Sequence, residues 1–545
     1  PEPMLIHRPR YTGAFAAAVA VAVMLGAANL LLGDLNQDEG WYLYAAGEVA
    51  EGRFPYRDFA FTQGPMLPLV YSLITPWVEA QGLAAGRGFT WLLGLVAALL
   101  AASSARRLGG RAAQVMAFAL IGVNVYHSYF TTVVKTYALC ALFLAVAVYA
   151  LVRWVDRRAA PWLVLAGAAL ALAAGTRISS GALLPVVGLW LLFNRTRWGT
   201  WSWFWFGVGG GVTLLAVFVP FLVTAREGFL FGLLEFHTLR EAGSFISSLV
   251  FKGGFVSRLV QAYGVATILV LLLAAAKVWR PFRGHDSGYH QTDAFALVRM
   301  LWVGVGVVTL VHLSAPFPYD DYQVPLFPVL AVALCVSWAY AARAWSSLGF
   351  RWRANEEPAD PPCTRWLVWG VVLAATAAAF SSPINQEWMI AGRDRIWWNI
   401  KPTPSLLQLR DEASRLRAED DSGILLTQDT YLAVEAGLKV PRGWEMGPFS
   451  YYPDWSDERA EALHLVNRNR LERELATSSA RFAAFSGYGF GIASPAVQPV
   501  PDEERAALLA RVAERYVLER TVPRFGQAAT TLEIYRRGDD GADTP

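Results

Sequence analysis

One polar stretch between two apolar segments near the N-terminus has the residue types for acid–base chemistry. It carries an adjacent acid pair, Asp38 and Glu39, followed by Arg53, Arg57 and Asp58. One carboxylate can take the proton of an acceptor hydroxyl or amine while the second orients that acceptor. An acid pair also suits an ordinary helix start, through capping and the helix dipole. A plain connector does not need this density of carboxylates and guanidinium groups, so we interpret the stretch as an active-site loop.

Further ionisable and polar residues occur beside apolar runs much later in the chain. Charged groups at membrane depth cost roughly 2.5–3.5 kcal/mol and therefore usually mark function. The candidates for substrate contacts are His127, Lys135, Arg177, His237, Arg240, His312, Asp320 and Tyr322. Lysine and arginine bind phosphate well, which predicts an anionic substrate at the membrane surface. Structural alternatives stay open. Lys135 can be a snorkelling lysine, and His237 can lie on a solvated amphipathic helix. The residues after His312 can be a polar loop with prolines at a helix start.

The elements that must position these residues are apolar segments. Of the 545 residues, 55% are hydrophobic and 17% are charged, whereas soluble domains average about 25% charged residues. A membrane-spanning helix needs about 20 mostly apolar residues. About eleven segments are candidates: 14–33, 86–105, 112–127, 131–152, 161–176, 178–193, 203–223, 259–278, 295–314, 322–342 and 366–381. The sequence therefore predicts a mostly α-helical, polytopic membrane protein.

The distribution of lysine and arginine predicts the orientation of these spans. Basic residues gather at every second junction between them, as they do in cytosolic loops. This alternation puts the N-terminus in the cytosol and loop 34–85, with two juxtamembrane helices, outside. We expect an integral protein of a prokaryotic plasma membrane.

The composition changes near residue 382. Residues 1–381 form the predicted membrane domain, and residues 382–545 alternate strand-like apolar runs with helical patterns. That alternation predicts a soluble α/β domain, which an odd number of spans makes extracytoplasmic. The net charge of +3 gives no indication of nucleic acid as a partner. The three scattered cysteines contain no CxxC pair, so the sequence predicts neither a disulfide framework nor a cysteine zinc site.

The active-site loop resembles the first outer loop of the GT-C superfamily of integral-membrane glycosyltransferases. The resemblance rests on the Asp38–Glu39 pair, on GRFPYRD at 52–58, on Gly64–Pro65 and on YDDYQVPLFP at 319–328. It covers about residues 10–345 and is similar above all to the branch of protein O-mannosyltransferases and lipid A aminoarabinose transferases. The C-terminal region departs from the β-trefoil domain of the protein O-mannosyltransferases, which leaves the acceptor open.

The resemblance implies inverting transfer of a sugar from a polyprenyl-phosphate donor, with Asp38 as general base and Glu39 in support. The acceptor is an unidentified protein, lipid or glycan, and the spans contact membrane lipids. No cofactor is required, a divalent metal is optional, and no metal ligand is assigned. Two other classes stay open. One is a lipid or sugar transporter or flippase, which predicts charges at mid-span and an internal repeat. The other is a non-catalytic membrane assembly protein on a GT-C scaffold.

Overall fold

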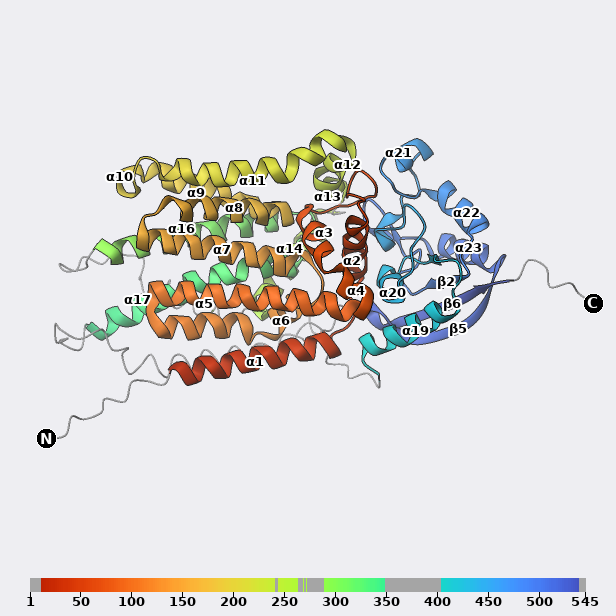
Figure 1. Ribbon diagram of the computed structural model, residues 1–545, viewed down its shortest axis with the longest axis horizontal. Helices are drawn as coiled ribbons and strands as arrows, with labels where there is room; N and C mark the ends of the chain where they lie inside the picture. Colours follow the sequence, from red (N-terminus) through yellow and green to blue (C-terminus); the bar gives the residue numbers. More distant parts are fainter. Residues whose placement is uncertain are drawn as a thin grey trace, which may run out of the picture.

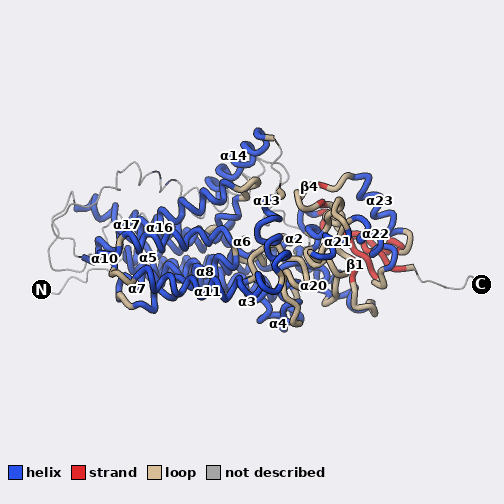
Figure 2. Tube along the Cα trace, turned by 90° about the horizontal axis from the view of Figure 1, so that it is seen from above, coloured by secondary structure: helices blue, strands red, loops and turns tan. Residues whose placement is uncertain are grey.

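A bundle of long helices is continued at one end by a mixed α/β region, with short loop helices between the two (Figure 1). The computed structural model describes residues 11–240, 244–262, 268, 271, 289–347 and 403–538. Within these described residues, the strands lie at the end of the molecule that holds the C-terminal region (Figure 2). The molecule is therefore mostly helical, in agreement with the expected fold class.

Six segments of the described chain are helical, long and apolar enough to cross a membrane. They include α1 (Tyr11–Leu32), α5 (Leu83–Gly122), α7 (Thr136–Arg157), α11 (Ser202–Thr224), α16 (Tyr289–Ser314) and α17 (Phe327–Ser347). Shorter apolar helices complete the bundle: α8 (Ala160–Thr176), α9 (Leu183–Phe193) and α14 (Phe245–Ala262).

Most predicted spans correspond to these helices, with two differences. Most of α14 lies before predicted span 259–278. Span 86–105 and most of span 112–127 fall within α5, which is kinked at Gly110, where φ is 87°. That backbone conformation favours glycine, so α5 consists of two helical segments. Predicted span 366–381 and most of span 259–278 lie outside the described residues. The count of eleven stays a prediction.

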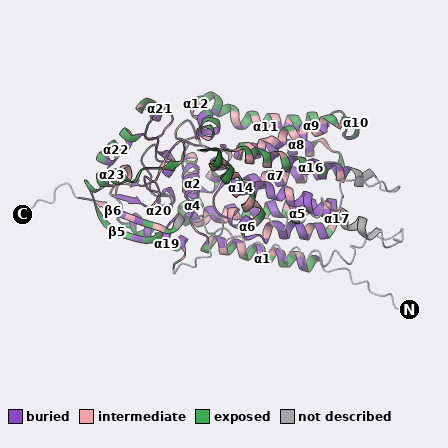
Figure 3. Cartoon of the chain, turned by 180° about the vertical axis from the view of Figure 1, so that it is seen from behind, coloured by how far each residue is buried: buried purple, intermediate pink, exposed green. Residues whose placement is uncertain are grey.

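The outer faces of the bundle are apolar. Met24 of α1 and Leu215 of α11 are each 62% exposed, and exposed positions run along both helices (Figure 3). Soluble monomers rarely expose contiguous apolar surface of this extent. The bundle is therefore that of an integral membrane protein, and these side chains face lipid.

The loop between α1 and α5 contains α2 (Gln37–Ala50), α3 (Met66–Tyr71) and α4 (Thr75–Gln81). The start of α2 is a capping box, because Asn36 caps the helix and the Glu39 carboxylate accepts the Asn36 N–H at 3.1 Å. This satisfies backbone donors that a helix start otherwise leaves without partners. The predicted helix start at the acid pair is therefore observed.

A buried ion pair fixes α2 against the bundle. The Arg87 guanidinium donates to both Glu39 oxygens at 2.8 and 2.6 Å, and both side chains are 0% exposed. Its remaining N–H groups donate to the carbonyl oxygens of Gly33 and Asp34, at 3.0 and 2.8 Å, where the chain leaves α1. The guanidinium thus satisfies carbonyl groups at a helix end that water cannot reach.

The C-terminal region carries a four-stranded sheet in the order β1-β2-β6-β5. β1 (Leu425–Leu426) is parallel to β2 (Phe482–Phe485), whereas β6 (Thr530–Arg537) is antiparallel to both β2 and β5 (Tyr516–Phe525). The described helices of this region include α19 (Ser405–Glu419), α20 (Thr430–Ala436), α22 (Arg468–Thr477) and α23 (Asp502–Ala513).

The C-terminal region packs directly on α2. A Cβ atom at Gly40 would lie 2.2 Å from the backbone nitrogen of Tyr431, so only glycine allows this approach of α2 to α20. The Gln37 amide donates to Asp429 at 2.9 Å, and the Tyr44 hydroxyl accepts the Val440 N–H at 3.1 Å. The loop helices and the C-terminal region share one hydrophobic core.

We predict that Arg87→Met destabilises the protein by about 3–5 kcal/mol, because the substitution leaves the Glu39 carboxylate buried without its cation. The measurement is the free energy of unfolding in detergent. Arg57→Met is the matched control, since Arg57 pairs with Asp58 at the surface and exposed pairs contribute at most about 1 kcal/mol. Equal losses in the two variants would contradict the structural role of the buried pair.

Candidate active site

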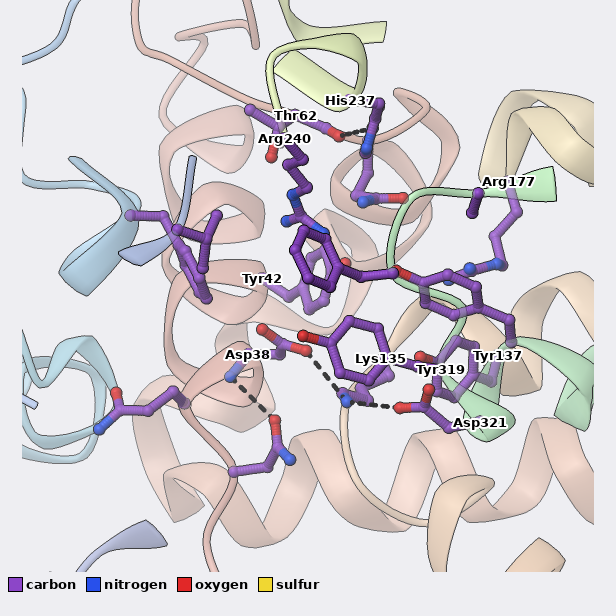
Figure 4. Close-up of a pocket in the computed structure, with 18 of the residues that line it drawn as sticks. Asp38, Tyr42, Thr62, Lys135, Tyr137, Arg177, His237, Arg240, Tyr319 and Asp321 are labelled. Carbon is purple, nitrogen blue, oxygen red and sulfur yellow. Dashed lines mark hydrogen bonds and ion pairs between the residues drawn. The ribbon is translucent and has the colours of Figure 1, made fainter. Parts of the chain in front are cut away.

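A cavity of about 570 Å³ lies where the bundle, α2 and the C-terminal region meet. This volume is within the usual range for small-molecule sites. The residues that line it come from widely separated parts of the chain, as the close-up in Figure 4 shows. The charged and histidine residues among them are Asp38, Lys135, Arg177, His237, Arg240, His312 and Asp321.

An acid–cation–acid cluster lies on one wall of the cavity. The Lys135 ammonium is 3.1 Å from Asp38 Oδ2 and 3.2 Å from Asp321 Oδ2. The other Asp38 oxygen, Oδ1, accepts the Trp41 indole N–H at 3.1 Å. Burial alone would lower the pKa of Lys135, but Tyr137 and the two carboxylates raise the pKa well above its usual value. The ammonium is therefore charged, and both carboxylates are held toward the cavity.

Arg177 lies across the cavity from the C-terminal region, at the break between α8 and a short 3₁₀ turn (Figure 4). Its guanidinium donates to Thr136 Oγ1 at 3.0 Å and lies between the rings of Tyr137 and Tyr322, 4.8 and 4.9 Å from their centres. Its Nε is buried without a hydrogen-bond partner. Among the described residues, no carboxylate pairs with this guanidinium, so it can bind an anion.

Arg240 is a second guanidinium on the cavity wall. It follows α13 (Phe236–Thr238) and lies 4.8 Å from the centre of the Phe236 ring, with a buried Nε that has no hydrogen-bond partner. Two arginines that each have an uncommitted N–H donor thus line one cavity. This arrangement suits a phosphate group, which accepts several charge-assisted hydrogen bonds.

Two histidines of the cavity have hydrogen-bond partners on one ring nitrogen. His237 Nε2 is 3.0 Å from the Thr62 carbonyl oxygen, and His312 Nε2 is 2.9 Å from Ser179 Oγ. Burial, and then the nearby Arg240 charge, lower the pKa of His237 to about 4. His237 is therefore neutral at physiological pH and donates its Nε2–H to Thr62.

Comparisons with known proteins agree with this architecture. Residues 62–223 match the family model described as dolichyl-phosphate-mannose-protein mannosyltransferase. The apo structure of ArnT from Cupriavidus metallidurans superposes with a TM-score of 0.60 at 17% identity, over 96% of this chain and 98% of ArnT. The chain has the GT-C fold.

Two other GT-C structures align over most of the chain. ArnT bound to undecaprenyl phosphate gives a TM-score of 0.56 at 16% identity, covering 96% of this chain and 98% of that one. The Archaeoglobus fulgidus oligosaccharyltransferase tethered to an acceptor peptide gives a TM-score of 0.51 at 11% identity, over 99% of this chain and 75% of the oligosaccharyltransferase. No curated protein matches the sequence significantly.

The structure brings seven of the residues expected from the sequence to one cavity. They are Asp38, Lys135, Arg177, His237, Arg240, His312 and Tyr322. Two others are buried elsewhere. Glu39 points away from the cavity into the ion pair with Arg87, and His127 packs 5.5 Å from the Phe327 ring. Glu39 therefore positions α2 and does not line the cavity beside Asp38.

The three charged residues expected from the later part of the loop also lie outside the cavity lining. Arg53 forms ion pairs with Glu48 and with Glu445 of the C-terminal region. Arg57 and Asp58 pair with each other at 2.7 Å near the surface. These charges pair within the loop and with the C-terminal region, and their expected contact with substrate stays a prediction.

Sequence reasoning missed several residues of the GT-C cavity. The side chain of Asp320, the expected acid of its loop, lies outside the described residues, whereas its neighbour Asp321 contacts Lys135. The YDDY segment indicates that an acid from this loop reaches the site, but it does not indicate which of the two aspartates does so. The C-terminal contributions, which include Phe449, Tyr488 and Gln527, come from turns and short 3₁₀ helices, whose sequences carry no periodic signal.

We predict that His237→Gln reduces the loss of stability at acid pH. The unfolded chain binds a proton at its histidines below about pH 6.5, whereas His237 in the folded protein resists protonation until about pH 4. Folded-state stability therefore falls as the pH drops through this window, by at most about 1.4 kcal/mol per pH unit for one proton. Gln keeps a donor for Thr62 and does not titrate. The measurement is the free energy of unfolding of the original protein and of His237→Gln from pH 7 to 4. The same loss of stability in both proteins would contradict the prediction.

Proposed function

We propose that this protein transfers a sugar from a polyprenyl-phosphate donor to an acceptor on the outer side of the membrane. The observation that carries the proposal is the pairing, in one cavity, of an accessible carboxylate with a buried arginine that lacks a carboxylate partner. Asp38 is 25% exposed, and Arg177 has an uncommitted Nε. Transfer from a phosphate carrier needs both groups: a base for the acceptor and a cation for the leaving phosphate.

Arg177 and Arg240 are suited to hold the donor phosphate. Both residues line the cavity and have a buried Nε without a hydrogen-bond partner, and the aromatic rings around Arg177 exclude water, which strengthens a charge–charge contact. The phosphate gains negative charge as the sugar leaves, so fixed cations stabilise the transition state more than the ground state. The similarity in fold to ArnT with bound undecaprenyl phosphate supports this assignment.

The donor's tail has an apolar surface beside the phosphate site. Val311 and Phe317 line the cavity next to His312, and the Phe317 ring packs 4.9 Å from that of Phe251 on α14. α14 projects obliquely from the bundle (Figure 2), and its Leu249 and Val250 are 60% and 64% exposed. A polyprenyl chain in the lipid phase can lie along these groups while its phosphate enters the cavity.

In the proposed step, Asp38 is the general base. The acceptor heteroatom attacks the anomeric carbon from the face opposite the phosphate, and the carbon–oxygen bond to the phosphate breaks as the new glycosidic bond forms. The acceptor proton passes to Asp38, and the electron pair of the broken bond leaves with the lipid phosphate. The anomeric configuration is thereby inverted. In this proposal the N-terminus is cytosolic and the cavity faces the exterior.

The C-terminal region forms the acceptor side of the site in this proposal. Its cavity-lining residues are Pro448, Phe449, Tyr488, Ile492, Val497 and Gln527, none of which is charged. Gln527 accepts the Gln37 N–H at 2.9 Å, which places this wall next to Asp38. An acceptor that enters along this wall meets the base before it meets the cations.

We predict that Asp38→Asn lowers sugar transfer about 10²- to 10⁴-fold, the usual contribution of a general base, while donor binding is retained. The assay is turnover of a purified polyprenyl-phosphate sugar by the protein in detergent. Asp58→Asn is the matched control, because Asp58 lies outside the cavity lining. Retained turnover in Asp38→Asn would exclude Asp38 as the base. Movement of the lipid across liposome membranes by the original protein, without any sugar transfer, would favour the flippase alternative.

We predict that Arg177→Met weakens binding of undecaprenyl phosphate about 10- to 100-fold. A hydrogen bond to a charged group contributes about 1.5–3 kcal/mol, which corresponds to this range. The measurement is the dissociation constant from quenching of intrinsic tryptophan fluorescence in detergent. Arg57→Met, which removes a surface guanidinium, should bind like the original protein. Equal affinities in the two variants would rule out Arg177 as the phosphate contact.

A further inference from the structure

Two carboxylates of the cavity face a single ammonium group. Lys135 Nζ lies 3.1 Å from Asp38 and 3.2 Å from Asp321, and its side chain is 9% exposed (Figure 4). The three residues come from different elements: the first turn of α2, the residue before α7, and η4 (Asp320–Leu326). The rings of Phe130 and Tyr137 lie 5.4 and 5.3 Å from the ammonium and shield it from solvent.

Two acids held this close need a cation between them, because two like charges at short range cannot both stay ionised. A divalent metal or an ammonium can supply that charge. A solved form of the Archaeoglobus fulgidus oligosaccharyltransferase, with a TM-score of 0.50 at 12% identity, is a complex with zinc and sulfate. The same fold therefore accommodates a metal in at least one protein.

With Lys135 in place, the residues of this cavity do not fit a divalent metal. Zinc sites use four ligands, of which at least three come from the protein, and magnesium needs one or two carboxylates that can coordinate it, together with waters and substrate phosphates. Within the described part of the chain, no group of three or more His, Cys, Asp or Glu side chains is arranged to hold a metal. Both carboxylates are already directed at Lys135, whose ammonium has three donors and no acceptor.

We propose that Lys135 is the site's own cation: a positioning residue that holds Asp38 and Asp321 in place of a divalent metal, so that sugar transfer proceeds without one. A single positive charge leaves the three-residue cluster with a net charge of −1, whereas a divalent ion would neutralise both carboxylates. The effect on turnover rests on the proposed function, but the effect on metal binding does not.

Manganese binding to Lys135→Ala tests the proposal. Removing the ammonium leaves two carboxylates without a counter-charge, so the purified variant should bind about one Mn²⁺ per chain in the millimolar range, detected by electron paramagnetic resonance. The original protein, from which a chelator has removed any metal, should show no such stoichiometric binding of Mn²⁺. The double variant Lys135→Ala/Asp321→Asn should lose the manganese site again. If Lys135→Ala does not fold, Lys135→Gln replaces it.

Turnover gives the second readout. The original protein should be insensitive to EDTA, and Lys135→Ala should be about 100-fold slower, the typical loss for one preorganised charge. Added Mn²⁺ should partly restore Lys135→Ala but not the double variant, and Lys135→Arg should retain most activity without metal. A mere structural role for Lys135 would not produce metal rescue.

Two results would overturn the proposal: inactivation of the original protein by EDTA together with stoichiometric Mn²⁺ binding, or no more manganese bound by Lys135→Ala than by the original protein. Failure of every protein to transfer sugar would instead count against the proposed function, and the manganese titration would still decide the role of Lys135.

Discussion

The buried ion pair between Arg87 and Glu39 is the contact on which the geometry of the cavity depends. Glu39 accepts the Val134 N–H at 3.1 Å in addition to the Arg87 guanidinium. The carboxylate therefore holds two backbone N–H groups, that of Asn36, two residues before Asp38, and that of Val134, directly before Lys135. Both cavity residues are thus close in sequence to groups that the same carboxylate holds, and they lie 3.1 Å apart. The interaction that orients the site lies outside the cavity.

The other constraint on the site is the close packing of α2 against α20. Gly40 allows the backbones to approach, and the Gln37 amide is buried against Asp429. The same helix turn thus presents Asp38 to the cavity, Glu39 to the bundle and Gln37 to the C-terminal region. A helix suits this purpose because consecutive residues point about 100° apart around its axis. α2 joins the membrane part and the C-terminal region through side chains on different faces.

The helical geometry also explains which predictions from the sequence succeeded. The positions of cations beside apolar runs, such as Lys135 and Arg177, were predictable, since placing a charge at membrane depth costs free energy and therefore usually marks a functional site. Adjacency misled in two ways. Glu39 shares its type with Asp38 but faces another direction, and Arg53 follows the 14 residues of α2, which extend about 20 Å. The C-terminal wall was not predictable, because loop residues have no periodic pattern that reveals their orientation.

The contact between Gln37 and Gln527 has a consequence for biogenesis. It joins residues near opposite ends of the chain, and the wall that contains Gln527 closes one side of the cavity. During synthesis α2 leaves the ribosome long before its partner, and Trp41, Tyr42 and Tyr44, all at most 6% exposed in the finished protein, have no C-terminal region to cover them. The cavity is therefore complete only after the C-terminal region has folded and docked onto α2, so its geometry is set late in the assembly of the chain.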